Sequence, residues 1–263
     1  MDSSRQCTLR LAFLNIMFCS AWFASGADGD NDPSFNADVN SAVYCVAVQT
    51  DGKILLGGEF SNIGGKGTAG MARVNADGTH DTAFIPNVFG QVRSLVVQPD
   101  GKTLVGGLFP TVNGGTARTN LARLNTNAVA ESAFRPYANG WVTSLALQTD
   151  GRILMGGKFT VVNGTNRNYL ARLGTNGLLD LTFNPNVNAP ARCLAVQPDG
   201  RILVGGEFTS VGGTARDRLV RLEASGAVDG SFVPSANGPI SCAALQVDGK
   251  ILQRQFIIKT GGL

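Results

Sequence analysis

Residues 191–208 read ARCLAVQPDGRILVGGEF: an apolar stretch, a Pro-Asp-Gly turn, a second apolar stretch and a glycine pair before phenylalanine. Proline sets the first turn angle and glycine supplies the positive φ of a tight hairpin, so this segment predicts two antiparallel strands. The Asp-Gly turn recurs with spacings of 49, 50, 49 and 49 residues, at Asp51, Asp100, Asp150, Asp199 and Asp248. The chain is therefore a tandem array of similar units.

Two phenylalanine motifs keep the same spacing. A D/E-x-x-F motif ends at Phe35, Phe84, Phe134, Phe183 and Phe232, and a G-G-x-F motif ends at Phe60, Phe109, Phe159 and Phe208. Each unit contains short β-rich runs separated by turn residues, and no stretch has the 3.6-residue period of a helix. We predict an all-β protein whose units begin with strands over 43–49, 92–98, 141–148, 191–197 and 240–246.

The first strand of each unit alternates small and bulky residues. Counting back from its final glutamine, Cys, Ser, Ala or Val alternates with Val, Leu or, once, Ala, so one face is small and the other bulky. Neither face is charged, which is typical of sheets that pack face to face at interior density. Repeated around an axis, this packing predicts a β-propeller with blades of about 49 residues. A β-solenoid usually has a shorter coil, and a sandwich does not need so regular a period.

The array is incomplete at its end. Residues 43–252 contain four complete units and a partial fifth, because a divergent tail, QRQFIIKTGGL over 253–263, stands where V-G-G-x-F is expected. Asp32 to Phe35, within an N-terminal segment over 27–42, form a motif copy without a preceding strand and could close the ring as the outer strand of the last blade. Otherwise the ring is open, and the chain is a fragment, a frame-shifted product or a protein with a decayed blade. Exposed sheet edges would then favour association with a partner.

Residues 1–26 have the pattern of a secretory signal. Arg5 and Arg10 precede an apolar stretch over 11–23, and the small residues Ala24, Ser25 and Gly26 follow it. We predict a cleaved signal peptide and a secreted, periplasmic or cell-surface protein without a membrane span after cleavage. An uncleaved anchor is the alternative, although the apolar stretch is short for a bilayer.

Composition excludes two classes of protein. The 263 residues are 43% hydrophobic, which excludes simple disorder. They carry a net charge of only +3 and contain no basic tract, so a nucleic-acid partner is not expected.

The repeat resembles a known family. The pattern V-x-x-L-A-V-Q-P-D-G-R/K-I-L-V-G-G-E-F-T, followed by L-A-R-L and D-x-x-F, is similar to the β-propeller delta-60 repeat family of exported, largely bacterial proteins over nearly all of residues 32–252. The resemblance implies a propeller fold and export, but no activity. The hairpin also resembles that of WD-repeat blades, and the glycine pair resembles that of kelch blades. The WD analogy implies that the Asp-Gly hairpin joins the innermost strand to its neighbour, and that the N-G loops and the loops after D-x-x-F share one face.

Residues that recur in every unit are interpreted as structural. Cys45, Cys193 and Cys242 occupy the position held by Ser94 and Ser144 in the other units, which predicts buried thiols in a small-residue packing position. The arginines of the A-R-L motif are expected to form inter-strand or inter-blade hydrogen bonds; they are Arg73, Arg123, Arg172 and Arg221.

The sequence contains few residues that could form a catalytic or metal-binding site. Asp28, Asp30 and Asp32 form only a weak candidate calcium site, and His80 is the single histidine, so we expect no metal and no cofactor. The non-repeating carboxylates are few, chiefly Glu59, Glu207, Asp217 and Glu223. We therefore predict that the protein is not an enzyme. A polysaccharide-acting propeller hydrolase or lyase is the alternative, with paired carboxylates in one cleft.

The candidate binding residues are those that differ between units. Phe89, Tyr137 and Trp141 lie in or beside the loops after D-x-x-F, on the face expected to carry Asn113, Arg118 and Arg167. The alternative, which the frequency of isolated exposed aromatics favours, is that they cover the ends of the core. We predict a non-catalytic extracytoplasmic module that binds a protein or glycan surface or acts as a scaffold. A non-functional fragment of a longer repeat protein remains a further alternative.

Overall fold

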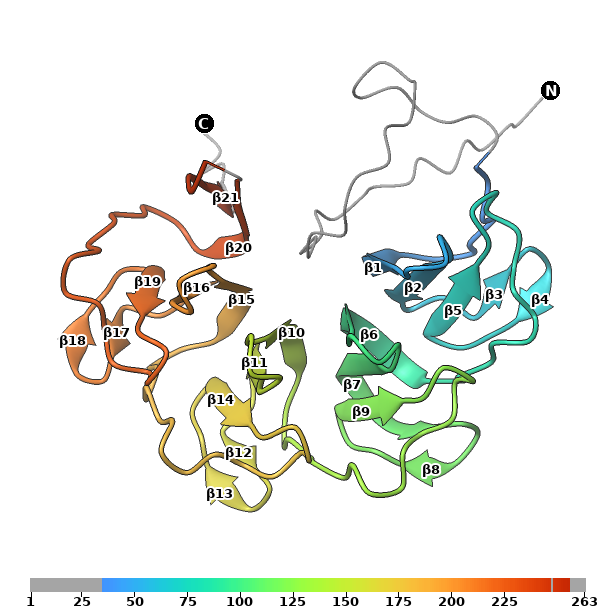
Figure 1. Ribbon diagram of the computed structural model, residues 1–263, viewed down its shortest axis with the longest axis horizontal. Coiled ribbons are helices and arrows are strands. Elements are labelled where there is room, and N and C mark those ends of the chain that lie inside the picture. The colour runs from blue at the N-terminus through green and yellow to red at the C-terminus, as the bar shows by residue number, and fades with distance from the viewer. Residues whose placement is uncertain (1–34, 247, 256–263) are drawn as a thin grey trace, which may run out of the picture.

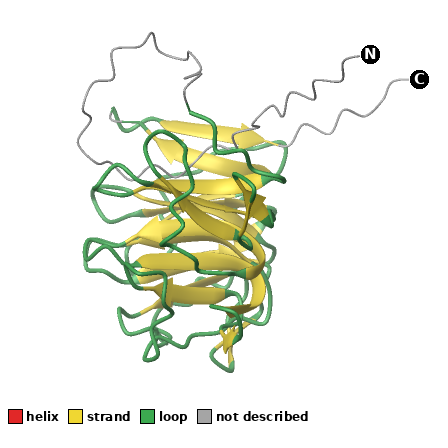
Figure 2. Ribbon diagram, turned by 90° about the vertical axis from the view of Figure 1, so that its right-hand side faces the viewer, coloured by secondary structure: helices red, strands yellow, loops and turns green. Residues whose placement is uncertain are grey.

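The computed structural model describes residues 35–246 and 248–255. In this part of the chain every regular element is a β-strand, and the sheets stand side by side in an open arc around a common centre (Figures 1 and 2). The prediction of an all-β propeller is confirmed. None of these residues forms a helix long and apolar enough to cross a membrane.

Each blade is an antiparallel sheet that starts at the centre of the arc. The inner strands are β1 (Val43–Val48), β6 (Phe89–Val97), β10 (Val142–Leu147), β15 (Ala191–Val196) and β20 (Ile240–Leu245). The second strands are β2 (Ile54–Gly58), β7 (Thr103–Val112), β11 (Ile153–Gly157), β16 (Ile202–Gly206) and β21 (Ile251–Gln255). The third strands are β5 (Met71–Val74), β9 (Leu121–Leu124), β14 (Leu170–Leu173) and β19 (Leu219–Leu222). The Asp-Gly hairpin joins the inner strand to the second strand, as expected.

Short hairpins line the outer rim of the arc (Figure 1). They are β3 (Asn62–Ile63) with β4 (Lys66–Gly67), β12 (Val161–Val162) with β13 (Thr165–Asn166), and β17 (Ser210–Val211) with β18 (Thr214–Ala215). In blade 2 the long strand β7 pairs with β8 (Thr116–Ala117) instead. The N-G loops of these hairpins contact the segments after D-x-x-F, since Asn163 and Tyr137 exchange hydrogen bonds. The predicted proximity of the two loop sets is confirmed.

Most of the core lies between blades, although one buried cluster lies within blade 1. One buried cluster joins Cys45 and Leu55 of blade 1 to Val92 and Phe109 of blade 2, and equivalent clusters join the later blades. The small-residue position lies at this interface. The Oγ of Ser94 accepts the backbone N–H of Leu145 in the next blade at 3.0 Å. The predicted nesting of bulky against small faces therefore describes the blade contacts.

The glycine pair makes this nesting possible. A Cβ on the first glycine would collide with the next inner strand, as at Gly57, where it would lie 2.6 Å from a methyl group of Val92. A Cβ on the second would collide with the β-bulge that opens its own inner strand, as at Gly157, where it would lie 1.9 Å from the carbonyl oxygen of Trp141. The motif is thus required by close approach on two sides of the strand.

The cysteines of the complete blades are buried thiols, as predicted, whereas Cys242 of blade 5 is only partly buried. Cys45 and Cys193 form no disulfide, and burial raises the pKa of Cys193 to about 12 and that of Cys45 as well. Because the thiolate is the reactive form, we expect neither thiol to react with iodoacetamide at pH 8 in the folded protein. Mass spectrometry of labelled peptides checks this, with the urea-unfolded chain as the positive control. Rapid labelling of either residue under native conditions would contradict it.

The recurring arginine clamps each blade to the next. In blade 3, Arg172 forms an ion pair with Asp180 at 2.9 Å, and its guanidinium lies 4.4 Å from the centre of the Phe183 ring. It also donates a hydrogen bond to the carbonyl oxygen of Ala224, in a turn of blade 4. Arg73 and Arg123 repeat the arrangement. The predicted inter-blade hydrogen bonding is confirmed for these three arginines, whereas Arg221 donates to Asp229 and Ser231 of its own blade.

The clamp makes stability depend on pH. The hydroxyl and backbone N–H of Thr182, together with Arg172, lower the pKa of Asp180 to about 2. An unfolded aspartate has a pKa of about 3.9, so this carboxylate stabilises the folded state above that pH and loses its effect as pH falls from about 4 to about 2. We expect the urea concentration at the unfolding midpoint to be lower at pH 2.5 than at pH 5. The decrease should be smaller in Asp180→Asn than in the wild type. An equal decrease in that variant would exclude the clamp as a cause.

The two ends of the arc differ from the complete blades. In blade 5, Arg254 pairs with Cys242, just as Gly205 pairs with Cys193 in blade 4. Strand pairing therefore continues beyond residue 253, where the divergent tail was expected to begin. Phe35 packs on blade 1, and Val39 bridges to Ile63 of the same blade. The expectation that the 32–35 motif joins the last blade is therefore wrong for Phe35, and its other residues lie outside the described part. Among residues 35–246 and 248–255, no strand closes the ring between β1 and β20 (Figure 1).

Candidate functional site

Of the six candidate binding residues, three are held by internal contacts. The amide of Asn113 donates to the carbonyl oxygens of Pro86 and Ala128. Arg118 and Arg167 are buried and donate to the carbonyl oxygens of Glu131 and Leu181, respectively. Asn113 thus fastens its outer loop to the segment after Phe84, whereas Arg118 and Arg167 are bonded to the D/E-x-x-F motif of their own blade.

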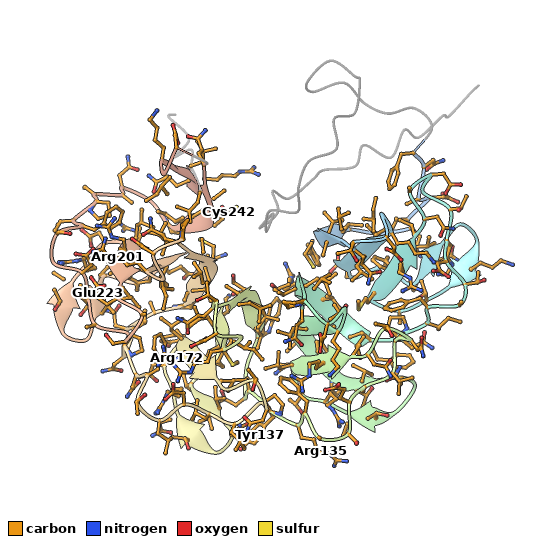
Figure 3. All side chains as sticks on the ribbon, viewed as in Figure 1. Arg135, Tyr137, Arg172, Arg201, Glu223 and Cys242 are labelled. Atoms are coloured by element: carbon orange, nitrogen blue, oxygen red, sulfur yellow. The ribbon has the colours of Figure 1, made fainter. Side chains whose placement is uncertain are left out.

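The aromatic candidates occupy different regions. Tyr137 is exposed at the outer rim together with Arg135 (Figure 3). Phe89 is exposed at the start of β6. The equivalent position of blade 3 is Asn139, whose side-chain oxygen accepts hydrogen bonds from two backbone N–H groups. Trp141 is half-buried directly before β10, an inner strand. The structure therefore separates Trp141 from Tyr137, and the predicted set is not one site.

Trp141 belongs to a cluster that the sequence did not identify. The guanidinium carbon of Arg93 lies 3.7 Å from the ring centre of Tyr44 and 5.0 Å from that of Trp141. The ammonium group of Lys158 lies 5.9 Å from the Trp141 ring. Arg93 therefore joins aromatic rings from the blades on either side of its own.

Two polar residues complete the cluster. The side-chain amide of Gln91 accepts a hydrogen bond from Arg93 at 2.6 Å and donates one to Glu59 at 2.9 Å. Burial and a hydrogen bond to Glu59 raise the pKa of Tyr44. We call Tyr44, Glu59, Gln91, Arg93, Trp141 and Lys158 the inner-strand cluster. Its residues come from the inner strands of blades 1, 2 and 3 or lie directly beside the inner or second strands.

The inner-strand cluster is formed once, not in every blade. The position of Arg93 holds Tyr44, Thr143, Arg192 and Ser241 in the other units, and the position of Lys158 holds Glu59, Leu108 and Glu207. An assembly of unlike side chains can contact a ligand asymmetrically, whereas a residue common to all blades performs the same structural task in each.

The candidate catalytic carboxylates are dispersed. Glu207 forms an ion pair with Arg192 of its own blade, and Glu223 forms one with Arg201 (Figure 3 labels the second pair). Glu59 is bonded in the inner-strand cluster of blade 1, whereas Asp217 lies two residues before β19 of blade 4. Glu59, Glu207 and Glu223 are therefore each bonded to a different partner.

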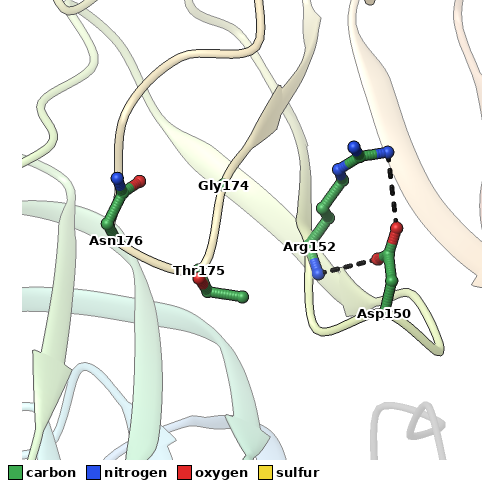
Figure 4. A pocket seen from close by; sticks show the side chains of 5 residues that line it. All are labelled: Asp150, Arg152, Gly174, Thr175 and Asn176. Carbon is green, nitrogen blue, oxygen red and sulfur yellow. Dashed lines mark hydrogen bonds and ion pairs between the residues drawn. The ribbon is translucent and has the colours of Figure 1, made fainter.

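A shallow hollow lies beside a hairpin of blade 3 (Figure 4). Its volume is about 330 Å³, and it is lined by Asp150, Arg152, Gly174, Thr175 and Asn176. Asp150 is bonded to Arg152 across the Asp-Gly turn, and the carbonyl oxygen of Thr175 accepts a hydrogen bond from Arg123. The same turn pair recurs in other blades, so the hollow follows from the repeat.

The described residues contain no group of three or more His, Cys, Asp or Glu side chains placed to hold a metal ion. The weak calcium candidate, Asp28, Asp30 and Asp32, lies outside them. His80 lies in a turn of blade 1, where burial lowers its pKa.

Solved structures with a similar fold include a lyase and a WD40 propeller domain. Virginiamycin B lyase from Staphylococcus aureus shares 14% identity over 81% of this chain and 63% of that chain, with a TM-score of 0.51. The WD40 beta propeller domain of Doa1 shares 15% identity over 82% of this chain and 61% of that chain, with a TM-score of 0.57. This chain therefore spans less than two thirds of either structure, and the likeness concerns the fold alone. No curated protein sequence matches the chain.

The repeat itself matches a family model described as a domain of unknown function (DUF5122) beta-propeller. The matches cover residues 49–84, 98–130, 148–183 and 197–232, which together are more than half of the chain. The chain belongs to the DUF5122 beta-propeller family.

Proposed function

We propose that this protein is an exported, non-catalytic binding module whose ligand, a glycan or protein surface, contacts the inner-strand cluster. The single observation that carries the proposal is the junction of Tyr44, Arg93 and Trp141 across three consecutive blades. Aromatic and arginine side chains dominate recognition sites, and a rigid propeller holds them without a large ordering cost. Export is supported by the signal-like pattern over residues 1–26.

The proposal excludes catalysis because Glu59 and Glu207 belong to different blades and each is already bonded to another side chain. A glycoside hydrolase needs two carboxyl groups a few ångströms apart, one of which is free to donate a proton. Here Glu207 is paired with Arg192, and Glu59 is bonded to Gln91 in a different blade.

The test measures binding and turnover on the same substrates. The purified chain is incubated with immobilised dextran, laminarin, xylan and polygalacturonate, and with a protein array; retained chain and released products are both measured. We expect retention on at least one support, loss of about tenfold in affinity for Trp141→Ala, and no released product. Tyr137→Ala, which removes an exposed aromatic from the outer rim, is the matched control and should bind like the wild type.

Two outcomes would contradict the proposal. One is retention that Trp141→Ala leaves unchanged, because the ligand would then contact another surface. The other is depolymerisation of a polysaccharide that Glu59→Gln or Glu207→Gln abolishes, because the protein would then be an enzyme.

A further inference from the structure

Blades 2 and 4 carry an arginine at the same position of the inner strand, with different neighbours. In blade 4, Arg192 is neutralised by Glu207, with its Nε 2.7 Å from the carboxylate. Glu207 occupies the variable position of G-G-x-F, and in blade 2 the same position is Leu108. Arg93 therefore lacks the carboxylate that its counterpart has.

Neither the positive charge nor all the N–H donors of the Arg93 guanidinium are matched by partners within the described part of the chain. Its faces contact Tyr44 and Trp141, and one terminal nitrogen donates to the neutral amide of Gln91. Its Nε is buried without a hydrogen-bond partner among the described residues. Stacking on aromatic rings uses the faces of a guanidinium and leaves its in-plane N–H groups for an oxyanion.

A second cation, Lys158, also lies near the Trp141 ring. The ammonium group of Lys158 is exposed and, within the described part of the chain, neither Lys158 nor Arg93 has a carboxylate in salt-bridge contact. Glu59 is the nearby acid, and the amide of Gln91 stands between it and Arg93. Two cations and one carboxylate leave a net positive charge around a half-buried indole ring.

From this geometry we infer that the inner-strand cluster binds a carboxylated polysaccharide. Arg93 and Lys158 contact the carboxylates, and a sugar ring lies against Trp141, whose indole offers an apolar face and a polar edge. A uronic acid polymer carries one carboxylate on each sugar ring, so it presents both features at once. An acidic polypeptide carries the carboxylates without the ring. This inference rests on the proposed function and specifies its ligand class.

The chain supplies its own test, because Leu108→Glu restores the carboxylate that blade 4 has. The introduced glutamate should pair with Arg93 as Glu207 pairs with Arg192, and should weaken binding of polygalacturonate by about tenfold or more. Leu108→Gln has nearly the same size without the charge, and should bind within about twofold of the wild type. Lys158→Gln should reduce affinity and its dependence on salt. Leu108 is 37% exposed, so these variants should fold, and their melting temperatures verify this.

The outcomes separate this inference from the proposed function. Polygalacturonate binding that is weakened by Leu108→Glu and exceeds binding of poly-L-glutamate supports the inference. Equal binding by Leu108→Glu and wild type overturns it, and so does equal binding of poly-L-glutamate. If a neutral polysaccharide binds through Trp141 and polygalacturonate does not, the inference falls and the binding module stands. If no ligand depends on Trp141, both fall.

Discussion

Replacing Gly157 by alanine will destabilise the protein by about 3 kcal/mol or more, because the added methyl group collides with backbone that cannot move independently. A Cβ there would lie 1.9 Å from the carbonyl oxygen of Trp141. That oxygen accepts the N–H of Lys158 at 2.9 Å, so displacing it breaks a hydrogen bond of the bulge. Urea denaturation followed by circular dichroism measures the loss.

The matched control for this substitution is Gly67→Ala. Gly67 lies in the exposed strand β4, and a Cβ built on it meets no atom within 4 Å. Its replacement should change stability by no more than about 1 kcal/mol, in the stabilising direction, since alanine restricts the unfolded chain. Similar effects for Gly67→Ala and Gly157→Ala would show that close approach is not why the glycine pair recurs.

Removing the ring of Phe183 will cost about 3–5 kcal/mol, the usual range for a fully buried phenylalanine. Phe183 has no exposed surface and belongs to the cluster between blades 3 and 4 with Val187 and Phe208. Phe183→Ala also removes the ring on which Arg172 stacks. The cavity would therefore weaken the contact between two blades. Thermal and urea unfolding of the variant measure the loss.

Phe232 provides a control at the same position of the repeat. It is only half-buried, because the third strand and turn that would cover it are absent from the described part of blade 5. Phe232→Ala should therefore cost clearly less than Phe183→Ala, by about 1–2 kcal/mol or more. Equal losses would show that the ring is stabilised by its own blade and not by the following one.

The repeat made the fold predictable. Alternation along each first strand indicated sheets buried on both faces, and the Cys or Ser position proved to be the blade interface. The same reasoning could have been applied to Arg118 and Arg167, since Arg216 recurs at their position and recurrence indicates a structural role. Their internal hydrogen bonds are thus a missed consequence of the repeat.

The inner-strand cluster could not be predicted in the same way. Tyr44, Arg93 and Trp141 are about 50 residues apart, and their contact depends on a bulge that displaces the register at the start of each inner strand. The pairing of Arg192 with Glu207 also crosses this bulge. Period and composition show which residues differ between units, but the direction of each side chain depends on the displaced backbone.

The location of the core between blades has an evolutionary consequence. Because the clusters between consecutive blades join the bulky face of one unit to the glycine pair of its neighbour, duplicating or deleting one whole period in the gene recreates the junctions already present. A deletion of half a period would leave two mismatched surfaces. Recombination between copies can therefore vary the number of units while the contacts between blades stay the same. Single units can meanwhile diverge in sequence and acquire residues that bind a ligand.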